Sequence, residues 1–442
     1  MFKWHCASAR LTDYTQGKDS PEGILNVNFH SMIISLKEGT LLCFVNMLSC
    51  RFFVKGNSVK RMSLVTVSFV TISVSVVISF VFFLNYNNCS FAILHPKMIN
   101  QINGIEWKPK GDNKNLTYTY SWPKCKQNHS AANVAGFNSL PGHIKDFLYY
   151  RHCRHFPMLL DLPDKCGGPE GSADVFLLLV IKSSPKNYNR REVLRNTWAK
   201  ERLQNGVWIR RLFILGTQNS GFEKTTLNNL LEIEHRKYKD ILQWDFHDTF
   251  YNLTLKQILF LEWMETNCPH VRFMLNGDDD VFANTDNMVE YLKNLEDNDG
   301  SKHLFAGHLV KNVGPIRYPD SKYYIPVQVY KSESYPLYCS GGGFILSGYT
   351  ARTIYNMSHS IILLPIDDVY MAMCLEKAGL HPESHSGIKA LGLQIPDKSA
   401  DPYDPCFYRE ILLVHRFLSV HMLVMWHHLH NPQLNCSLST KM

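Results

Sequence analysis

Three consecutive carboxylates, Asp278, Asp279 and Asp280, follow a predicted strand at 271–275. Alternate side chains of an extended backbone share a face, so Asp278 and Asp280 can point together while Asp279 points away. Two carboxylates on one side favour Mg²⁺ or Mn²⁺, with water and a diphosphate in the remaining positions. A calcium loop of the EF-hand type is excluded, because the glycine and the glutamate that it needs are missing. On the triplet alone, a solvated acidic turn remains an alternative.

A second acidic pair, Asp367 and Asp368, opens a predicted helix that runs to about Ala378. Carboxylates at the start of a helix often only cap it and interact with its dipole. A reaction in which a sugar hydroxyl displaces a diphosphate needs a base near the acceptor, and a positioned carboxylate can be that base. Both interpretations stay open for this pair.

A run of small residues and a late histidine could complete such a site. Gly341, Gly342 and Gly343 let a backbone approach a bulky ligand closely, although a loop or a bulge explains them almost as well. His415 ends an apolar run and is either a metal ligand or a buried core histidine. By itself, the histidine favours the core.

Three basic residues are candidates for binding a diphosphate. Lys182, Arg191 and Arg195 follow or lie close to the first predicted buried strand. Ammonium and guanidinium groups bind diphosphate oxygens well, but surface salt bridges explain such residues equally well.

The elements that must position these residues alternate along the chain. The apolar run at 175–181 is typical of a strand buried on both faces of a parallel sheet. Such alternation predicts an α/β fold with a mostly parallel sheet, whose ligands bind beyond the carboxyl ends of the strands. Further strands are predicted at 211–215 and 270–275, and helices at 190–202, 223–238 and 253–266.

Composition narrows the function classes. The 442 residues are 45% hydrophobic and 19% charged, enough for one large folded domain with appendages. The net charge of +7 is spread widely, without a dense basic block interleaved with aromatic residues, so nucleic acid is not an expected partner. Neither a dinucleotide-binding nor a P-loop glycine motif follows the first strand.

The segment 62–84 predicts a membrane anchor. It has no charged residue and would form a helix of about 35 Å, enough to span a hydrocarbon core of roughly 30 Å. Lys55, Lys60 and Arg61 precede it and no Lys or Arg lies at 85–96, which predicts a cytosolic N-terminus and type II topology. A cleaved signal peptide is the alternative. The segment 1–61 is either a cytosolic tail or an over-extended start.

The rest of the chain is expected in the lumen, with a stem at 85–145 and a catalytic domain at 146–442. Nine cysteines lie after the anchor, and their spacing predicts structural disulfides rather than a zinc site. Their odd number leaves at least one outside intramolecular pairs. Glycosylation sequons agree with a lumenal location and begin at Asn88, Asn115, Asn128, Asn252, Asn356 and Asn435.

Several motifs in order make residues 147–436 resemble the beta-1,3-glycosyltransferase family. They are Arg190-Arg191 with Arg195-Asn196-Thr197-Trp198, Asp248 to Lys256, the Asp triplet, and Lys322-Tyr323-Tyr324-Ile325-Pro326. The resemblance implies a single GT-A (Rossmann-like) catalytic domain behind a type II anchor in the Golgi membrane.

By the same resemblance, the Asp triplet is the metal motif, with Asp280 as a direct ligand and His415 as a later ligand for Mn²⁺ or Mg²⁺. Asp368 falls at the position of the general base. The remaining residues implied to contact substrate or nucleotide are Asp278, Asp279, Tyr323, Gly341, Gly342, Gly343 and Asp367.

The implied reaction is an inverting transfer of GlcNAc from UDP-GlcNAc, in beta-1,3 linkage, to a terminal galactose. The acceptor would be a core 1 O-glycan or an N-acetyllactosamine chain of a glycoprotein. A beta-1,3-galactosyltransferase of the same fold that uses UDP-galactose is one alternative, and a non-catalytic Golgi glycan-binding protein or chaperone is another. Ala199 and Ser340 replace glycines that are common in the family, which leaves the donor and acceptor preference open.

Overall fold

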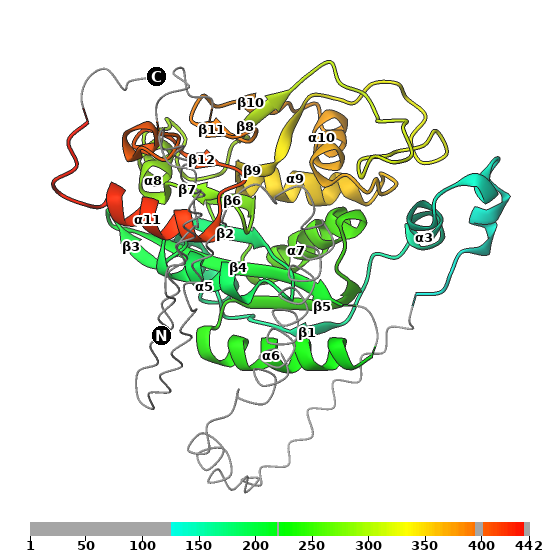
Figure 1. Ribbon diagram of the computed structural model, residues 1–442, viewed down its shortest axis with the longest axis horizontal. Coiled ribbons are helices and arrows are strands. Elements are labelled where there is room, and N and C mark those ends of the chain that lie inside the picture. The colour runs from blue at the N-terminus through cyan, green and yellow to red at the C-terminus, as the bar shows by residue number, and fades with distance from the viewer. Residues whose placement is uncertain (1–124, 219–220, 394–400, 437–442) are drawn as a thin grey trace, which may run out of the picture. The chain divides into compact units, whose positions relative to one another are not determined.

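A computed structural model describes residues 125–218, 221–393 and 401–436, which all belong to one compact unit (Figure 1). The described residues contain no helix that is long and apolar enough to span a membrane. The predicted anchor at 62–84, the segment before it and the first part of the predicted stem lie outside the described residues.

A nine-stranded mixed sheet forms the centre of the unit, in the order β1-β5-β4-β2-β6-β9-β8-β10, with β3 paired to β4. The strands β5, β4, β2 and β6 run parallel, as the alternation of strands and helices predicts. Their bounds are β2 Val175–Lys182, β4 Val207–Thr217, β5 Ile241–His247 and β6 Phe273–Asp278.

The other half of the sheet departs from the prediction of a mostly parallel arrangement. The strand β9 (Tyr338–Ser347) is antiparallel to both β6 and β8 (Phe305–Val310). β9 contains the glycine run 341–343, for which the sequence suggested close approach of a ligand or a loop or bulge and not a strand, since glycine is depleted in strands. The edges carry β1 (Met158–Leu160), β3 (Arg202–Gln204) and β10 (Glu383–Ser384).

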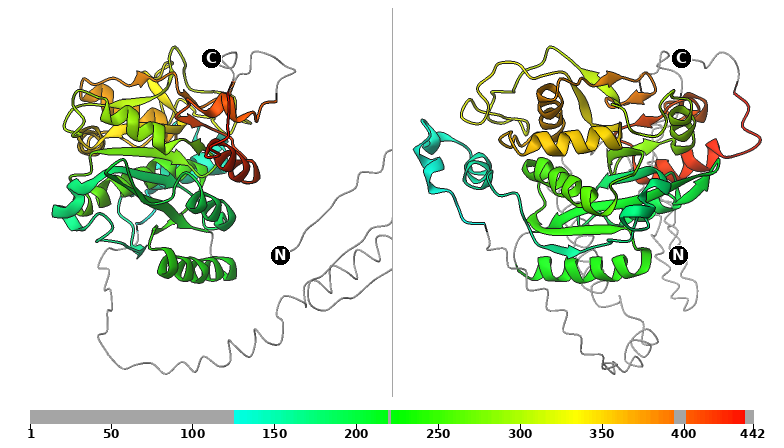
Figure 2. Two further views of the ribbon diagram at one scale, coloured as in Figure 1. Left: turned by 90° about the vertical axis from the view of Figure 1, so that its left-hand side faces the viewer. Right: turned by 180° about the vertical axis from the view of Figure 1, so that it is seen from behind.

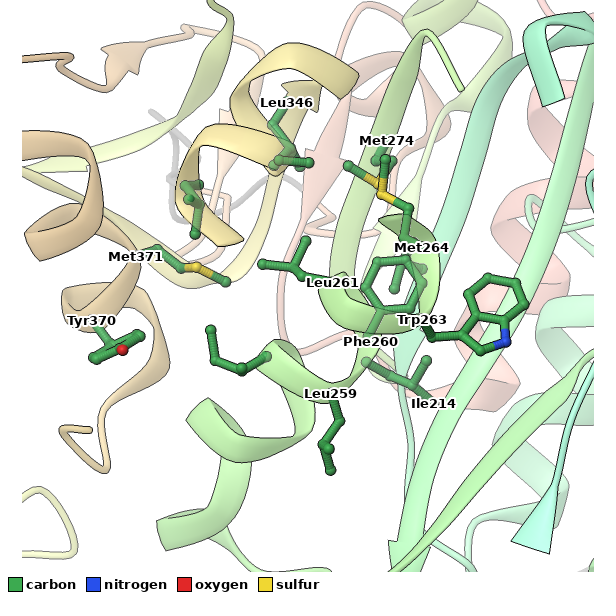
Figure 3. Packing of buried hydrophobic residues seen from close by; sticks show 14 of the residues in the cluster. Ile214, Leu259, Phe260, Leu261, Trp263, Met264, Met274, Leu346, Tyr370 and Met371 are labelled. Atoms are coloured by element: carbon green, nitrogen blue, oxygen red, sulfur yellow. The ribbon is translucent and has the colours of Figure 1, made fainter. Parts of the chain in front are cut away.

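Helices cover both faces of this sheet (Figures 1 and 2). One apolar cluster joins the sheet to α7 (Leu253–Asn267), α9 (Gly348–Ser358) and α10 (Asp367–Lys377). Figure 3 shows α7 at its centre, with Phe260 and Leu261 among side chains from the sheet and from α10. The opposite cluster contains α5 (Tyr188–Asn196), α6 (Phe222–Tyr238), α8 (Thr285–Lys293) and α11 (Ser419–Leu429).

Most predicted helices are confirmed within one residue, but α5 is shorter than the predicted helix at 190–202. It ends at Asn196, and the following Trp198 is fully buried, with its indole N–H donating to the Val281 carbonyl at 3.0 Å. Arg202 already belongs to β3, which pairs antiparallel with β4. Burial of one large side chain in the tertiary structure therefore overrides the local helical pattern.

A second, three-stranded sheet lies beside the end of β6. Its strands are β11 (Ile388–Lys389), β12 (Leu413–Val414) and β7 (Phe282–Ala283), and β12 pairs antiparallel with β7. Because β7 directly follows the Asp triplet, the pairing carries the C-terminal end of β12 back to that triplet. Residues more than 130 positions apart in the sequence thus become neighbours.

Part of the predicted stem is folded. Residues 125–145 contain the short helices at His129–Asn133 and Phe137–Ser139 and the start of α3 (Gly142–Tyr150), with a small apolar cluster of their own. The disulfide Cys125–Cys153 closes this N-terminal lobe, which we define as residues 125–157. Cys166–Cys268 and Cys406–Cys436 are the other two disulfides of the described residues, which agrees with the prediction of structural disulfides. Cys339 and Cys374 are buried free thiols.

Candidate active site

The site begins where neighbouring strands end. β2 and β6 pair in parallel with Lys182 directly opposite Asp278, so both side chains emerge at one edge of the sheet. The Lys182 ammonium group lies 3.2 Å from Asp278 Oδ1 and 2.7 Å from Asp367 Oδ2. It also donates to the Gly341 carbonyl of β9 at 3.2 Å. One buried lysine therefore ties three elements together at this edge.

Asp278, Asp280 and His415 form the predicted metal cluster. Each offers one ligand atom, and these atoms lie within 4.8 Å of one another. His415 Nε2 is 3.4 Å from Asp280 Oδ1 and 3.7 Å from Asp278 Oδ2. His415 Nδ1 lies 3.1 Å from the Ala390 carbonyl, which can only accept a hydrogen bond, so Nδ1 carries the proton and Nε2 presents its lone pair to the cluster.

The glycines of β9 make room for side chains of the site. A Cβ atom on Gly342 would lie 2.6 Å from the His415 ring, and one on Gly343 would lie 2.5 Å from the Leu413 side chain. A Cβ atom on Gly341 would lie 3.3 Å from Asp368 Oδ2. The close approach predicted for these glycines is therefore real, but in this structure protein side chains make it.

Asp279 points away from its two neighbours, as the alternation of an extended backbone predicts. It is buried and accepts hydrogen bonds from Ser183 Oγ at 2.7 Å, Asn187 Nδ2 at 2.8 Å and Arg190 Nη1 at 2.7 Å. These partners fill both carboxylate oxygens. The structure thus corrects the assignment of Asp279 to nucleotide binding, because Asp279 anchors the start of α5 to the end of β6.

Asp368 occupies the first turn of α10, and α10 packs against β9. Asp368 Oδ2 accepts a hydrogen bond from the Gly341 N–H at 2.9 Å, and Asp368 Oδ1 accepts one from the Val369 N–H at 2.8 Å. Burial, and after it the neighbouring Asp367 carboxylate, raise the pKa of Asp368 to about 7. A carboxylate whose pKa lies near neutral pH is suited to accept a proton from a hydroxyl.

Asp367 has a different role from its neighbour. It is buried, and its contact with Lys182 makes it part of the charge balance at the strand ends. Burial lowers the pKa of Lys182, but the carboxylates of Asp278 and Asp367 outweigh burial and hold this pKa above its usual value. Lys182 is therefore a permanent cation. This geometry favours support of the site by Asp367 over direct contact with substrate.

The charge balance of the site suits a divalent cation. The site contains four carboxylates, those of Asp278, Asp280, Asp367 and Asp368, and the Lys182 ammonium group contacts two of them, Asp278 and Asp367. Burial raises the pKa of Asp278, the charge of Lys182 opposes this effect, and the carboxylates of Asp367 and Asp280 add to it. Two carboxylates and an imidazole with its second nitrogen already bonded are a donor set that fits Mn²⁺ or Mg²⁺.

Arg191 and Arg195 do not reach the metal cluster. Both are buried, Arg191 in a bidentate pair with Glu234 at 2.7 and 2.8 Å, and Arg195 between Glu234 and Asp240. Arg191 approaches the acidic motif only through Ser183 Oγ, at 3.1 Å. The nucleotide-binding role predicted for these two arginines is therefore corrected to a structural one.

Sequence reasoning missed Arg190. Its guanidinium lies 2.7 Å from Asp279 and 3.5 Å from Asp280, and its side chain is 42% exposed. The available signal was the Arg190-Arg191 motif, because successive helical residues face different directions and either arginine could face the site. Tyr323 lies in the long connection between β8 and β9, 41% exposed, with its ring 5.3 Å from that of Phe250. Its contact with substrate stays a prediction.

Comparison with known proteins identifies a family and several similar proteins. Residues 189–386 match the model of the galactosyltransferase family. The chain is 54% identical to N-acetyllactosaminide beta-1,3-N-acetylglucosaminyltransferase 3 of Homo sapiens, over 72% of this chain and 83% of that protein. It is 50% identical to the human acetylgalactosaminyl-O-glycosyl-glycoprotein beta-1,3-N-acetylglucosaminyltransferase, over 71% and 81%. It is 45% identical to UDP-GlcNAc:betaGal beta-1,3-N-acetylglucosaminyltransferase 7 of Mus musculus, over 71% and 77%.

Proposed function

Because this chain belongs to the galactosyltransferase family, we propose that it transfers GlcNAc from UDP-GlcNAc, in beta-1,3 linkage, to a terminal galactose. The acceptor is a galactose-terminated glycan of a glycoprotein, of the core 1 or the N-acetyllactosamine type. The names of the relatives support the donor and the linkage, and the arrangement of the site supports the reaction type.

One observation carries the reaction type: a candidate base stands beside a candidate metal site, and buried contacts join the two. Asp368 is next to Asp367 in the chain, Asp367 is paired with Lys182, and Lys182 is paired with Asp278. A general base and a site for the leaving diphosphate are the two requirements of a single displacement. A glycan hydroxyl would be held between them.

Each residue then has a defined task. Asp278, Asp280 and His415 would hold Mn²⁺ or Mg²⁺, which when bound would supply positive charge to neutralise the leaving diphosphate. Asp368 Oδ1 or Oδ2 accepts the proton of the galactose hydroxyl while that oxygen forms its bond to the anomeric carbon and the bond from that carbon to UDP breaks. One displacement inverts the anomeric configuration. We propose that the domain has the GT-A fold, which a Rossmann-like sheet with metal-binding carboxylates at a strand end supports.

The test offers the purified full chain UDP-GlcNAc or UDP-galactose, each with a galactose-terminated disaccharide, with Mn²⁺, with Mg²⁺ or with EDTA. The expected product is a trisaccharide formed from UDP-GlcNAc only, dependent on the metal, with a beta-1,3 linkage by NMR. Transfer from UDP-galactose instead would assign the related galactosyltransferase activity. No transfer by folded protein from either donor would favour a non-catalytic role.

We also propose that residues 62–84 anchor the enzyme as a type II protein of the Golgi membrane. The support is the uncharged segment with basic residues before it, and the disulfides of the folded unit agree with an oxidising lumen. Protease treatment of sealed Golgi vesicles checks this topology. The folded unit should survive until detergent opens the vesicles, and digestion without detergent would contradict the proposal.

A further inference from the structure

A cavity of about 710 Å³ lies away from the metal cluster, and no residue of that cluster lines it. Its walls are the N-terminal lobe, the carboxyl ends of β4 and β5, and the start of α7. Residues from these elements include His143, Arg151, Thr217, Asp245, Tyr251 and Asn252. The volume is within the range of small-molecule sites and would hold two or three sugar rings.

The charges of the lining balance. Two cationic residues, Arg151 and Lys224, face two anionic ones, Asp146 and Asp245, and Lys224 donates to Asp245. Burial lowers the pKa of His143, although Asp146 opposes this effect, so the imidazole is neutral at pH 7. A balanced lining offers no net attraction to a diphosphate or a sulfate. Its aromatic faces and scattered hydroxyl, amide and imidazole groups suit a neutral ligand with many hydroxyls.

A chain of aromatic rings leads from this cavity towards the candidate base. His143 stacks on Tyr251 with ring centroids 4.3 Å apart, and Tyr251 contacts Phe250 at 5.4 Å. Phe250 in turn contacts Tyr323 at 5.3 Å. Burial, and then Asp368 and Tyr323, raise the pKa of Tyr338 to about 12. The ring contacts thus run from the cavity to Tyr323, in the connection that precedes β9.

We propose that this cavity binds neutral saccharide residues. The proposal rests on its lining and on the aromatic path, and two sources of saccharide fit the chemistry. One is the inner part of the acceptor glycan, whose terminal galactose is at Asp368, and this source rests on the proposed function. The other is an N-linked glycan on Asn252, which lines the cavity.

The second source follows from the sequon Asn252-Leu253-Thr254. Asn252 Nδ2 donates to the His247 carbonyl at 2.8 Å, which directs the side chain along the wall of the cavity. Thr254 is buried and donates to the Leu364 carbonyl at 2.5 Å. A glycan attached at Asn252 would therefore emerge directly beside Tyr251 and His143.

The first arm of the test compares acceptors from a disaccharide to a hexasaccharide, all ending in galactose, on the full chain. The variants are Tyr251→Ala and His143→Ala, with Tyr349→Ala, an exposed tyrosine of α9, as the matched control. If the acceptor is the source, KM falls with acceptor length in the parent protein. The two cavity variants then lose this advantage by about three- to tenfold, the effect of one aromatic contact, and keep their kcat and KM for the disaccharide.

The second arm removes the N-glycans with an endoglycosidase and follows the melting temperature. If the Asn252 glycan is the source, trimming lowers Tm in the parent protein and in Tyr349→Ala, but not in Tyr251→Ala or His143→Ala. Saturation-transfer NMR with a free hexasaccharide needs no turnover. It decides whether acceptor-like saccharide binds even if the proposed transfer reaction fails with the disaccharide.

Two results would overturn the saccharide site. One is that the two cavity variants, with the parent Tm, change none of three quantities: the dependence of KM on acceptor length, the effect of glycan trimming on Tm, and the NMR saturation transfer to the hexasaccharide. The other is an increase in KM for UDP-GlcNAc that is the same for every acceptor length, because this would assign the cavity to the nucleotide.

Discussion

Two dense groups of charges lie close together in this fold, and their arrangements are opposite. The arginine cluster comprises Arg191, Arg195 and Arg211 with Glu234 and Asp240, and all of these side chains are buried. The site cluster comprises Asp278, Asp280, Asp367 and Asp368 with Lys182 and His415. Cations satisfy every acid of the first cluster, whereas acids outnumber cations in the second. The comparison teaches that fully paired charges hold the fold and incompletely paired charges are available for chemistry.

The geometry of the arginine cluster explains why it is closed. Asp240 accepts hydrogen bonds from Arg195 at 2.8 and 2.9 Å and from Arg211 at 2.6 and 2.9 Å. These bonds hold the pKa of Asp240 below its usual value although burial opposes the shift. A buried pair of this kind has no oxygen left for a ligand, and removal of one partner leaves an uncompensated charge.

The largest expected effect belongs to the site cluster and concerns activity. Asp368→Asn keeps the shape of the side chain and the acceptor atom for one backbone N–H, but it removes the base. We expect kcat to fall by about 10²- to 10⁴-fold, the usual contribution of general base catalysis, with an unchanged Tm. Steady-state kinetics and calorimetry on the same preparation check both parts. Activity above one tenth of the parent value would exclude Asp368 as the base.

The next effect belongs to the arginine cluster and concerns stability. Arg195→Leu leaves Glu234 and Asp240 without one of their partners. We expect the free energy of unfolding to decrease by about 3–5 kcal/mol, as for other broken buried pairs, with kcat per folded molecule unchanged. Urea unfolding and active-site titration measure the two quantities. Loss of catalysis in fully folded protein would restore Arg195 to the nucleotide site.

His415→Ala is expected to have a smaller effect on activity than Asp368→Asn, through weaker metal binding. The imidazole is one of three candidate metal ligands, so its loss should weaken the apparent affinity for Mn²⁺ by at least about tenfold, while high Mn²⁺ restores part of kcat. Titration of activity with Mn²⁺ gives the value, and His421→Ala on α11 is the control. An unchanged Mn²⁺ requirement would show that His415 is a core histidine.

The same two clusters show which parts of the fold and of the site could be predicted from the sequence. The strand β2, the helices α6, α7 and α10, and the joining of Asp278, Asp280 and His415 agree with the predictions from pattern and resemblance. Arg191 and Arg195 could not be assigned correctly, because their partners Glu234 and Asp240 lie on other elements and leave no local pattern. The strand β9 was missed since its glycines serve His415 and Asp368, a tertiary requirement that opposes strand propensity.

The pH dependence of kcat should reflect the site cluster, because Asp368 belongs to it. Asp368 must be deprotonated to act as a base, and its raised pKa of about 7 means that it gains a proton as the pH falls below 7. At saturating Mn²⁺ and donor, kcat should therefore fall about tenfold for each pH unit below the pKa. Tm should not fall with kcat from pH 7.5 to 6, because the folded state binds a proton at Asp368 that the unfolded state does not bind, and this contributes stability as the pH decreases. A flat profile down to pH 5 would contradict the assigned base.

The smallest effect is expected at Arg190, which lies on the boundary between the clusters. It precedes Arg191 in α5, yet its guanidinium contacts Asp279 and Asp280 rather than Glu234 and Asp240. Because its side chain is 42% exposed, solvent screens these pairs. Arg190→Ala should cost about 1 kcal/mol or less in stability and raise the KM for UDP-GlcNAc and the Mn²⁺ requirement by only a few-fold, with kcat nearly unchanged.

Arg190→Lys is the matched control, since it keeps the charge and loses the planar donor geometry. If the KM for UDP-GlcNAc and the Mn²⁺ requirement return to the parent values in this variant, Arg190 contributes mainly charge beside Asp280. If they do not, its hydrogen bond to Asp279 positions the acidic motif. A drop in kcat as large as that of Asp368→Asn would place Arg190 inside the reacting centre. The boundary between structural and chemical charges would then run between Arg190 and Arg191, one residue apart on the same helix.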